Sequence, residues 1–237
     1  MSRKEPDVPA KSKRQVKPQH KKDLSNTLVP RTPKQKTYIQ SLIHDCVVIC
    51  LGPAGTGKTY CAAVYAAMQL HLGEVNKLIV TRPNVPTGRS IGFFPGTIEE
   101  KMAPWVAPIT SVLKETLGSG EYECHIKHGN IEMVPLEVIR GRSWDDAIIL
   151  IDESQNLTMD ELKAVSTRIG RNSRMIFMGD ASQSDLANGK DNALHKFCDI
   201  IEKYAVPQTS IIEFTHEDVV RSDICAALVS AFYREGL

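Results

Sequence analysis

A glycine-rich loop near residue 55 carries a lysine and a hydroxyl at a spacing suited to binding phosphates. It reads Gly52-Pro53-Ala54-Gly55-Thr56-Gly57-Lys58-Thr59, fits G-x-x-x-x-G-K-[ST], and lies between an apolar run and an alanine-rich run. Glycines let the backbone N–H groups point inward at phosphates, and Lys58 supplies charge for the β- and γ-phosphates. The Thr59 hydroxyl suits Mg²⁺, which prefers oxygen ligands. The loop predicts a site for ATP and Mg²⁺, with Lys58 also acting in catalysis.

Two carboxylates follow the apolar run AIILI at 147–151. An apolar strand that ends in acids delivers them to the edge of a parallel sheet where ligands bind. Asp152 is predicted to hold Mg²⁺ through water, and Glu153 to polarise the water that attacks the γ-phosphate. The alternative for Glu153 is an acid that only interacts with the N-terminal dipole of the following turn.

A third polar loop follows the apolar run at 174–178 and contains Asp180 and Gln183. If the strand order is that of a P-loop core, both reach the same sheet edge. Gln183 is then predicted to contact the γ-phosphate or its attacking water. The alternative is an ordinary Gly-Asp turn with no role in the site.

The elements that must position these residues follow from the apolar pattern. Short β-rich runs predict strands at 46–51, 77–80, 147–151, 174–178 and 210–214. Helical spacing predicts helices at 33–45, 58–72, 97–117, 159–169, 192–204 and 219–233. Strands that are apolar throughout suit a sheet covered on both faces. The predicted fold class is therefore α/β, a P-loop three-layer sandwich with a mostly parallel central sheet.

The predicted organisation is a basic tail at 1–32 followed by one domain at 33–237. A long insertion is expected at about 82–145, with a possible hairpin at 121–139. Residues 1–30 hold eight Lys or Arg against three Asp or Glu, in a chain whose net charge is +1. This tail is expected to be disordered when alone, and either to contact nucleic-acid phosphates or only to aid solubility.

Six cysteines are scattered along the chain without the spacing of a disulfide scaffold or of paired metal ligands. No run of residues has the length and apolar character of a membrane span. The chain is therefore expected to be cytoplasmic, with reduced thiols and no membrane partner.

Several blocks of the sequence together resemble the PhoH-like ATPases. These are the phosphate-binding loop, Asp152-Glu153-Ser154-Gln155, the segment Gly179-Asp180 to Asp185, Thr81-Arg82-Pro83, 91–96, 140–147 and 218–221. The departures are small: Ser154, Phe94 and Ser222 stand where Ala, Leu and His are frequent. The resemblance covers about residues 33 to 237 and implies a single RecA-like core related to superfamily 1 helicases.

What the resemblance implies is ATP hydrolysis coupled to RNA or DNA, with helicase or remodelling activity as an extension. Gln35 looks like the glutamine that reads adenine in helicase-type cores; the alternative is a solvent-facing residue on an amphipathic helix. Arg82 resembles a block that touches the nucleic-acid backbone, and Arg140 and Arg142 are candidates to extend that surface. Each arginine alone is more often a solvated charge or a salt bridge.

A chain with one core lacks the arginines that a second core supplies in two-domain motors. The resemblance therefore implies a homo-oligomer, a hexameric ring in which a neighbouring subunit donates an arginine to the γ-phosphate. Arg221 is the first candidate, although it could equally serve its own subunit's nucleotide. The other candidates are Arg168, Arg171 and Arg174.

Two other functions fit parts of the pattern. One is an ATP-dependent nucleic-acid-binding switch or assembly module with little turnover, against which Glu153 argues. The other is a small-molecule kinase, which the acidic pair and the loop with Gln183 suit less well than activation of water.

Overall fold

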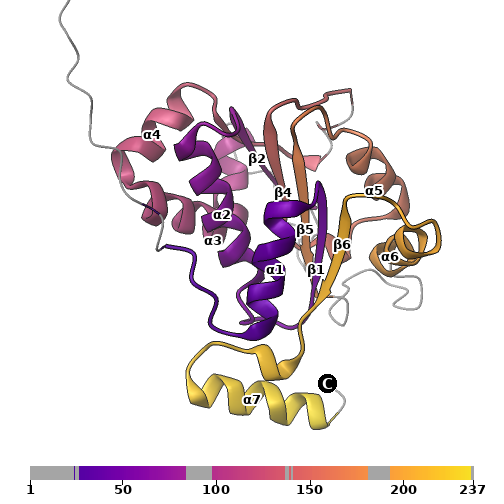
Figure 1. Cartoon of the computed structure of the whole chain (residues 1–237). Helices are drawn as coiled ribbons and strands as arrows, with labels where there is room; N and C mark the ends of the chain where they lie inside the picture. Colours follow the sequence, from indigo (N-terminus) through magenta and orange to yellow (C-terminus); the bar gives the residue numbers. More distant parts are fainter. Residues whose placement is uncertain are drawn as a thin grey trace, which may run out of the picture.

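A six-stranded parallel sheet forms the centre of the computed structural model, which describes residues 24, 27–83, 98–136, 139, 141–180 and 193–235. The strand order is β3-β2-β4-β5-β1-β6, and every neighbouring pair is parallel (Figure 1). The strands are β1 (Val47–Leu51), β2 (Lys77–Thr81), β3 (Ile131–Met133), β4 (Ala147–Ile151), β5 (Arg174–Gly179) and β6 (Thr209–Glu213).

Helices cover both faces of the sheet. They are α1 (Pro33–His44), α2 (Lys58–Leu72), α3 (Ile98–Leu117), α4 (Ser119–Lys127), α5 (Met159–Ser166), α6 (Ala193–Lys203) and α7 (Asp223–Arg234), with short 3-10 turns η2 (Ser154–Asn156) and η3 (His216–Asp218). Helices α1, α2 and α3 lie on one face, and α5 and α6 on the other (Figure 1). The predicted α/β class and three-layer arrangement are confirmed.

Alternation along the strands explains why the sheet needs two covers. In β4, Ile148 and Leu150 belong to the core cluster under α1, α2 and α3, whereas Ile149 and Ile151 belong to the cluster under α5 and α6. All of these side chains are fully buried. Because successive side chains of a strand point to opposite faces, a strand that is apolar throughout contributes to both cores.

The strands predicted from the sequence agree with the structure to within a residue at either end, as do the first three helices. The possible hairpin at 121–139 is wrong. Gly118 has a positive φ of 84°, after which Ser119–Lys127 forms α4 with Tyr122 packed on the core. The following β3 pairs in parallel with β2 at the sheet edge. The short run that forms β3 pairs with a strand that is distant in the sequence. The local apolar pattern does not reveal such a pairing.

Helices α5 and α7 are shorter than predicted, for identifiable reasons. Helix α5 ends at Ser166 because Ile169 forms a parallel bridge with Trp144. Helix α7 begins at Asp223 rather than 219. Ahead of it, Asp218 accepts hydrogen bonds from Thr215, and the Val220 N–H donates to the Gly55 carbonyl at 3.0 Å. The backbone donor that would extend the helix instead holds the phosphate-binding loop.

The predicted basic tail lies almost entirely outside the described residues. At its end, Leu24 is buried, and Leu28 packs against the core under α1. Within the described ranges, no helix combines the length and the apolar character that crossing a bilayer requires.

Candidate nucleotide site

Four neighbouring strands deliver the candidate site residues to one edge of the sheet. The carboxyl ends of β2, β4, β5 and β1 lie side by side because these strands are parallel and adjacent. Arg82 follows β2, Asp152 and Glu153 follow β4, Asp180 follows β5, and the glycine-rich loop follows β1. Ligands of open parallel sheets bind at this edge.

The glycine-rich loop depends on glycine at two closely packed positions. Gly52 has φ 133°, and a Cβ there would lie 2.5 Å from the Phe214 carbonyl oxygen. Gly57 has φ 88°, and a Cβ there would lie 2.7 Å from Gln35 Nε2. Side chains at either position would meet both backbone strain and a close neighbour. Phe214, which follows β6, and Gln35 of α1 therefore pack closely against the loop.

Lys58 lies over this loop and donates to its backbone. Its ammonium donates to the carbonyl oxygens of Gly52 at 2.6 Å and Pro53 at 2.9 Å. Burial lowers the pKa of Lys58, and nearby acidic groups, Cys50 and Asp180 first among them, partly offset that effect. A largely buried cation that lies against carbonyl oxygens favours the approach of an anion, which a triphosphate supplies.

Thr59 and Asp152 meet across the sheet edge. The Thr59 hydroxyl donates to Asp152 Oδ1 at 3.2 Å, although the two residues are far apart in sequence. Burial raises the pKa of Asp152, and the neighbouring Glu153 raises it further, while Arg82 lowers it. A hydroxyl and a carboxylate destabilised by burial form an oxygen donor set that fits Mg²⁺, whose charge would favour the ionised carboxylate.

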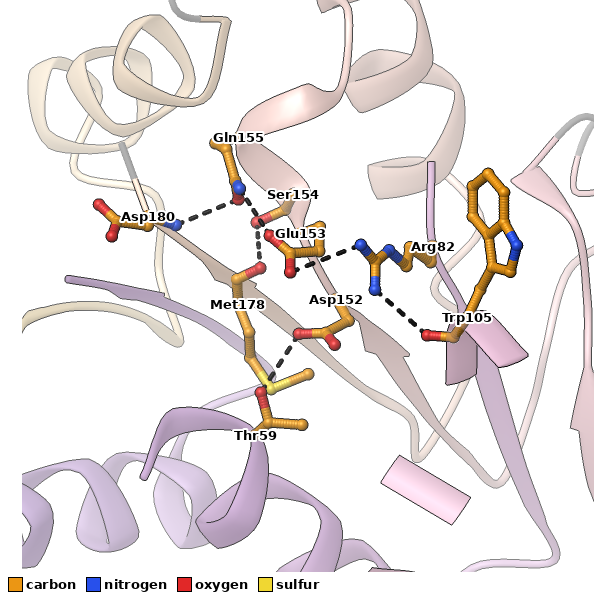
Figure 2. A network of polar contacts seen from close by, with 9 residues as sticks. All are labelled: Thr59, Arg82, Trp105, Asp152, Glu153, Ser154, Gln155, Met178 and Asp180. Carbon is orange, nitrogen blue, oxygen red and sulfur yellow. Dashed lines mark hydrogen bonds and ion pairs between the residues drawn. The ribbon is translucent and has the colours of Figure 1, made fainter. Parts of the chain in front are cut away.

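Glu153 adopts a left-handed backbone with φ 51°, which is uncommon for a non-glycine residue and costs free energy. Its carboxylate makes no cap hydrogen bond to η2. Instead, it accepts a hydrogen bond from Gln155 Nε2 at 2.6 Å and lies 3.6 Å from Arg82 Nη2 (Figure 2). The geometry therefore favours a functional carboxylate over one that only interacts with a helix dipole.

Gln35 is buried, so the alternative of a solvent-facing glutamine is wrong. Its Nε2 donates to the Thr56 carbonyl at 2.8 Å, and its Oε1 accepts from the Arg31 N–H at 2.8 Å. The Thr32 side chain caps α1 by accepting from the Gln35 N–H. Gln35 thus braces the phosphate-binding loop, while recognition of adenine stays a prediction.

Arg221 lies beside the glycine-rich loop of its own chain. A Cβ on Gly55 would lie 3.1 Å from Arg221 Cγ, and the preceding Val220 is hydrogen-bonded to Gly55. Among the other candidate arginines, Arg168 donates to Ala164 and Arg174 to Ile43. The structure brings only Arg221 of this set to the loop.

The comparisons with known proteins show the family of this chain. The PhoH family profile, described as PhoH-like protein, matches residues 27–233. The chain belongs to the PhoH-like family. It is 38% identical over 205 residues to a PhoH-like protein of Bacillus subtilis (strain 168), which covers 86% of this chain and 64% of that protein. It is 33% identical over 211 residues to protein PhoH of Escherichia coli (strain K12), covering 88% and 59%.

This PhoH-like chain spans about three fifths of the length of those two relatives. Among solved structures, it is similar to the large terminase of a thermophilic bacteriophage, with a TM-score of 0.50 and 11% identity. The similarity covers 87% of this chain and 50% of the terminase. At that identity it supports the fold alone.

For three other predicted contact residues of the PhoH-like chain, the structure gives a position for only one. Gln183 and Arg140 lie outside the described residues. Arg142 pairs with Glu132 at 3.2 Å on the edge strand β3. Glu132 also pairs with Lys77 at the start of β2, whereas Arg82 follows the end of that strand. The structure therefore does not place Arg142 beside Arg82.

Two residues that contact the site were missed from the sequence. Gln155 lies within the acidic motif, but the sequence predicts no role for it. Its position two residues after Glu153 is a signal that could have indicated their contact. Trp105 lies on α3, and its carbonyl accepts from Arg82 Nη1 at 3.2 Å. No sequence pattern links Trp105 to the site, because the contact joins a strand end to a distant helix.

Replacing Asp152 by asparagine is expected to stabilise the metal-free PhoH-like protein. A carboxyl whose pKa is raised on folding favours the fold below its ordinary pKa and destabilises it above the raised value. The neutral amide avoids that cost and keeps an oxygen to accept from Thr59. We expect the melting temperature at pH 7 in EDTA to rise by about 2–4 °C, since about 1 kcal/mol shifts it by that much.

Melting temperatures measured over a range of pH test whether the ionised Asp152 carboxylate causes this gain. The gain should shrink as the pH falls from 7 toward about 4, the ordinary aspartate range, because both proteins are then neutral at this position. Addition of Mg²⁺ should stabilise wild type and leave Asp152→Asn unchanged. A gain that is the same at pH 4 and pH 7 would contradict the assignment.

Proposed function

We propose that this chain hydrolyses ATP with Mg²⁺ and that polynucleotides stimulate the reaction. The observation that carries the proposal is the meeting of Thr59 with Asp152 at the sheet edge, with Glu153 next to them. This edge supplies a loop for phosphates, an oxygen pair for a metal ion and a carboxylate to accept a proton. Bound Mg²⁺ would neutralise charge that develops on the phosphates.

Each residue has a distinct role in the proposed reaction. The glycine-rich loop and Lys58 bind the β- and γ-phosphates, and Thr59 and Asp152 hold Mg²⁺. Glu153 takes a proton from the attacking water. Gln35 is proposed to contact the adenine, and Gln183 the γ-phosphate or the attacking water. We place the protein in the cytoplasm, which suits its six free cysteines.

Coupling to RNA or DNA is proposed from the family resemblance and from the position of Arg82. Its guanidinium lies at the same sheet edge, with 29% of its side chain exposed, and contacts Glu153. A group that touches both solvent and the proposed base is suited to connect polynucleotide binding with hydrolysis. Helicase activity would be a further step, and the tail and Arg140 are additional candidate contacts.

The test is phosphate release by the full chain with and without single-stranded RNA, single-stranded DNA and duplexes. We expect Mg²⁺-dependent release that one polynucleotide class raises several-fold. The concentration needed for stimulation should increase with salt, because phosphate contacts release counterions. Background release in every condition, together with an ATP-dependent change in oligomer size, would instead support a switch with little turnover.

We also propose that the chain assembles with copies of itself, as a ring of six subunits. Helix α7 carries Ile224 and Leu228 on one face, 68% and 52% exposed, and lies apart from both helix layers (Figure 1). It follows Arg221, so a copy docked on α7 would lie near the nucleotide site. We assign Arg221 to its own subunit's nucleotide, and Arg168, Arg171 and Arg174 stay candidates for donation to a neighbour.

Replacing Leu228 by serine is expected to reduce the subunit number measured by light scattering, because it removes apolar area from the proposed contact. Leu72→Ser is the matched control, since Leu72 is 54% exposed at the end of α2. An unchanged mass for Leu228→Ser would exclude this face from the interface. A monomeric wild type would exclude the ring.

A further inference from the structure

The carboxylate of Glu153 is held by two partners, one on each oxygen. Gln155 Nε2 donates to Oε2 at 2.6 Å, and Arg82 Nη2 lies 3.6 Å from Oε1 (Figure 2). With Gln155 on Oε2 and Arg82 against Oε1, both carboxylate oxygens already face a donor. A general base must have an oxygen within hydrogen-bond reach of the water that it activates.

The two partners hold Glu153 with unequal strength. Gln155 is 2% exposed, and its amide is fixed at both ends, because Oε1 accepts from the Asp180 N–H at 3.1 Å. Its hydrogen bond to Glu153 is short and charge-assisted. The pair between Arg82 and Glu153 is longer, and their side chains are 29% and 38% exposed. Exposed ion pairs of this kind contribute little, so Arg82 can leave at low cost while Gln155 stays.

Arg82 has a second anchor that keeps its guanidinium near the site. Nη1 donates to the Trp105 carbonyl, and Cζ lies 5.9 Å from the centre of the Trp105 ring, within reach of a cation–π contact. The guanidinium can therefore turn from Glu153 toward another anion while it keeps its contacts with Trp105 on α3. A phosphodiester is well suited to replace the carboxylate, because it accepts two parallel hydrogen bonds from arginine.

We propose that Arg82 exchanges Glu153 for a phosphate of the bound polynucleotide, and that this exchange frees Glu153 to act as the base. The inference rests on the proposed function and adds the residue that couples its two ligands. After exchange, Gln155 is the positioning residue that keeps the carboxylate aimed. Freed Oε1 takes a proton from water as that water attacks the γ-phosphorus, and the bond from phosphorus to the ADP oxygen breaks.

The test compares wild type with Arg82→Gln, in phosphate release without polynucleotide and at saturating polynucleotide. Glutamine keeps a donor for the Trp105 carbonyl and removes the charge that holds Glu153. We expect the unstimulated kcat to rise several-fold toward the stimulated wild-type value, and the ratio of stimulated to unstimulated rates to fall close to one. Lys114→Gln is the matched control, because Lys114 on α3 also has a 3.6 Å ion pair, with Glu123. It should keep the wild-type ratio.

Two more variants separate the exchange from a structural role. Arg82→Lys keeps the charge and should retain a low unstimulated rate and part of the stimulation. Gln155→Glu keeps an acceptor for the Asp180 N–H but removes the donor to Glu153. It should lower kcat at least tenfold with an unchanged KM for ATP, whereas damage to the fold would alter both.

Several outcomes would overturn the exchange while leaving the proposed function intact. One is that polynucleotide stimulates wild type and that Arg82→Gln has the same rates as wild type with and without polynucleotide. Another is that Arg82→Gln has a raised unstimulated rate but an unchanged ratio of stimulated to unstimulated rates, which would mean that the nucleotide itself displaces Arg82 from Glu153. A wild type that releases no phosphate under any condition would overturn both the function and the exchange.

Discussion

Lys58→Ala is expected to lose ATP hydrolysis by at least a hundredfold and to bind ATP more weakly. The ammonium is the cation that lies over the loop, donating to the Gly52 and Pro53 carbonyls. Removing one preorganised donor from a site where phosphate charge develops typically costs about 10²–10³ in kcat. Without Lys58 those carbonyls would also repel the γ-phosphate. Steady-state phosphate release and titration with a fluorescent ATP analogue measure the two effects.

The loss should not come from unfolding. Burial lowers the pKa of Lys58, which means that the charged ammonium is disfavoured at its position in the fold. Alanine removes that cost, so the melting temperature should be unchanged or higher. Lys163→Ala on the surface of α5 controls for loss of a positive charge. Wild-type hydrolysis by Lys58→Ala would end the assignment of this loop as the phosphate site.

Sequence patterns predicted the sheet well because its strands are apolar throughout. The run AIILI at 147–151 has no polar residue that could face solvent, so it predicts helices on both faces of the sheet. The two core clusters, one on each face, confirm this prediction. The glycine-rich loop was equally predictable, because its function constrains consecutive residues. The left-handed glycines at 55 and 57 are part of that local pattern.

Contacts between distant elements were not predictable in the same way. Arg82 and Glu153 meet because β2 and β4 are neighbours in the sheet, and strand order is not written in either segment. Trp105 reaches Arg82 through the packing of α3, and Val220 reaches Gly55 by interrupting a helical pattern. The edge strand β3 was missed because its three residues gain stability from β2 rather than from a local partner.

Glu153→Gln is the variant expected to separate binding from hydrolysis. The amide has the size of the carboxylate but cannot take a proton from water, and general base catalysis typically contributes about 10²–10⁴-fold. We expect hydrolysis to fall by that factor while the affinity for ATP with Mg²⁺ stays within about threefold of wild type. Thr59, Asp152 and Lys58 keep their contacts in this variant, so the binding groups are intact.

The thermal stability, ATP binding and hydrolysis of Glu153→Gln, compared with those of Lys58→Ala, decide what Glu153 does. If Glu153 only supported the local backbone, replacement by glutamine would lower the melting temperature and affect binding and hydrolysis together. A base predicts the opposite: a trapped ATP complex, seen as retained ATP after single-turnover mixing, with normal thermal stability. Since the left-handed backbone at Glu153 costs free energy whichever side chain it carries, glutamine should not relieve that strain. Hydrolysis by Glu153→Gln within tenfold of wild type would instead assign proton transfer to another group.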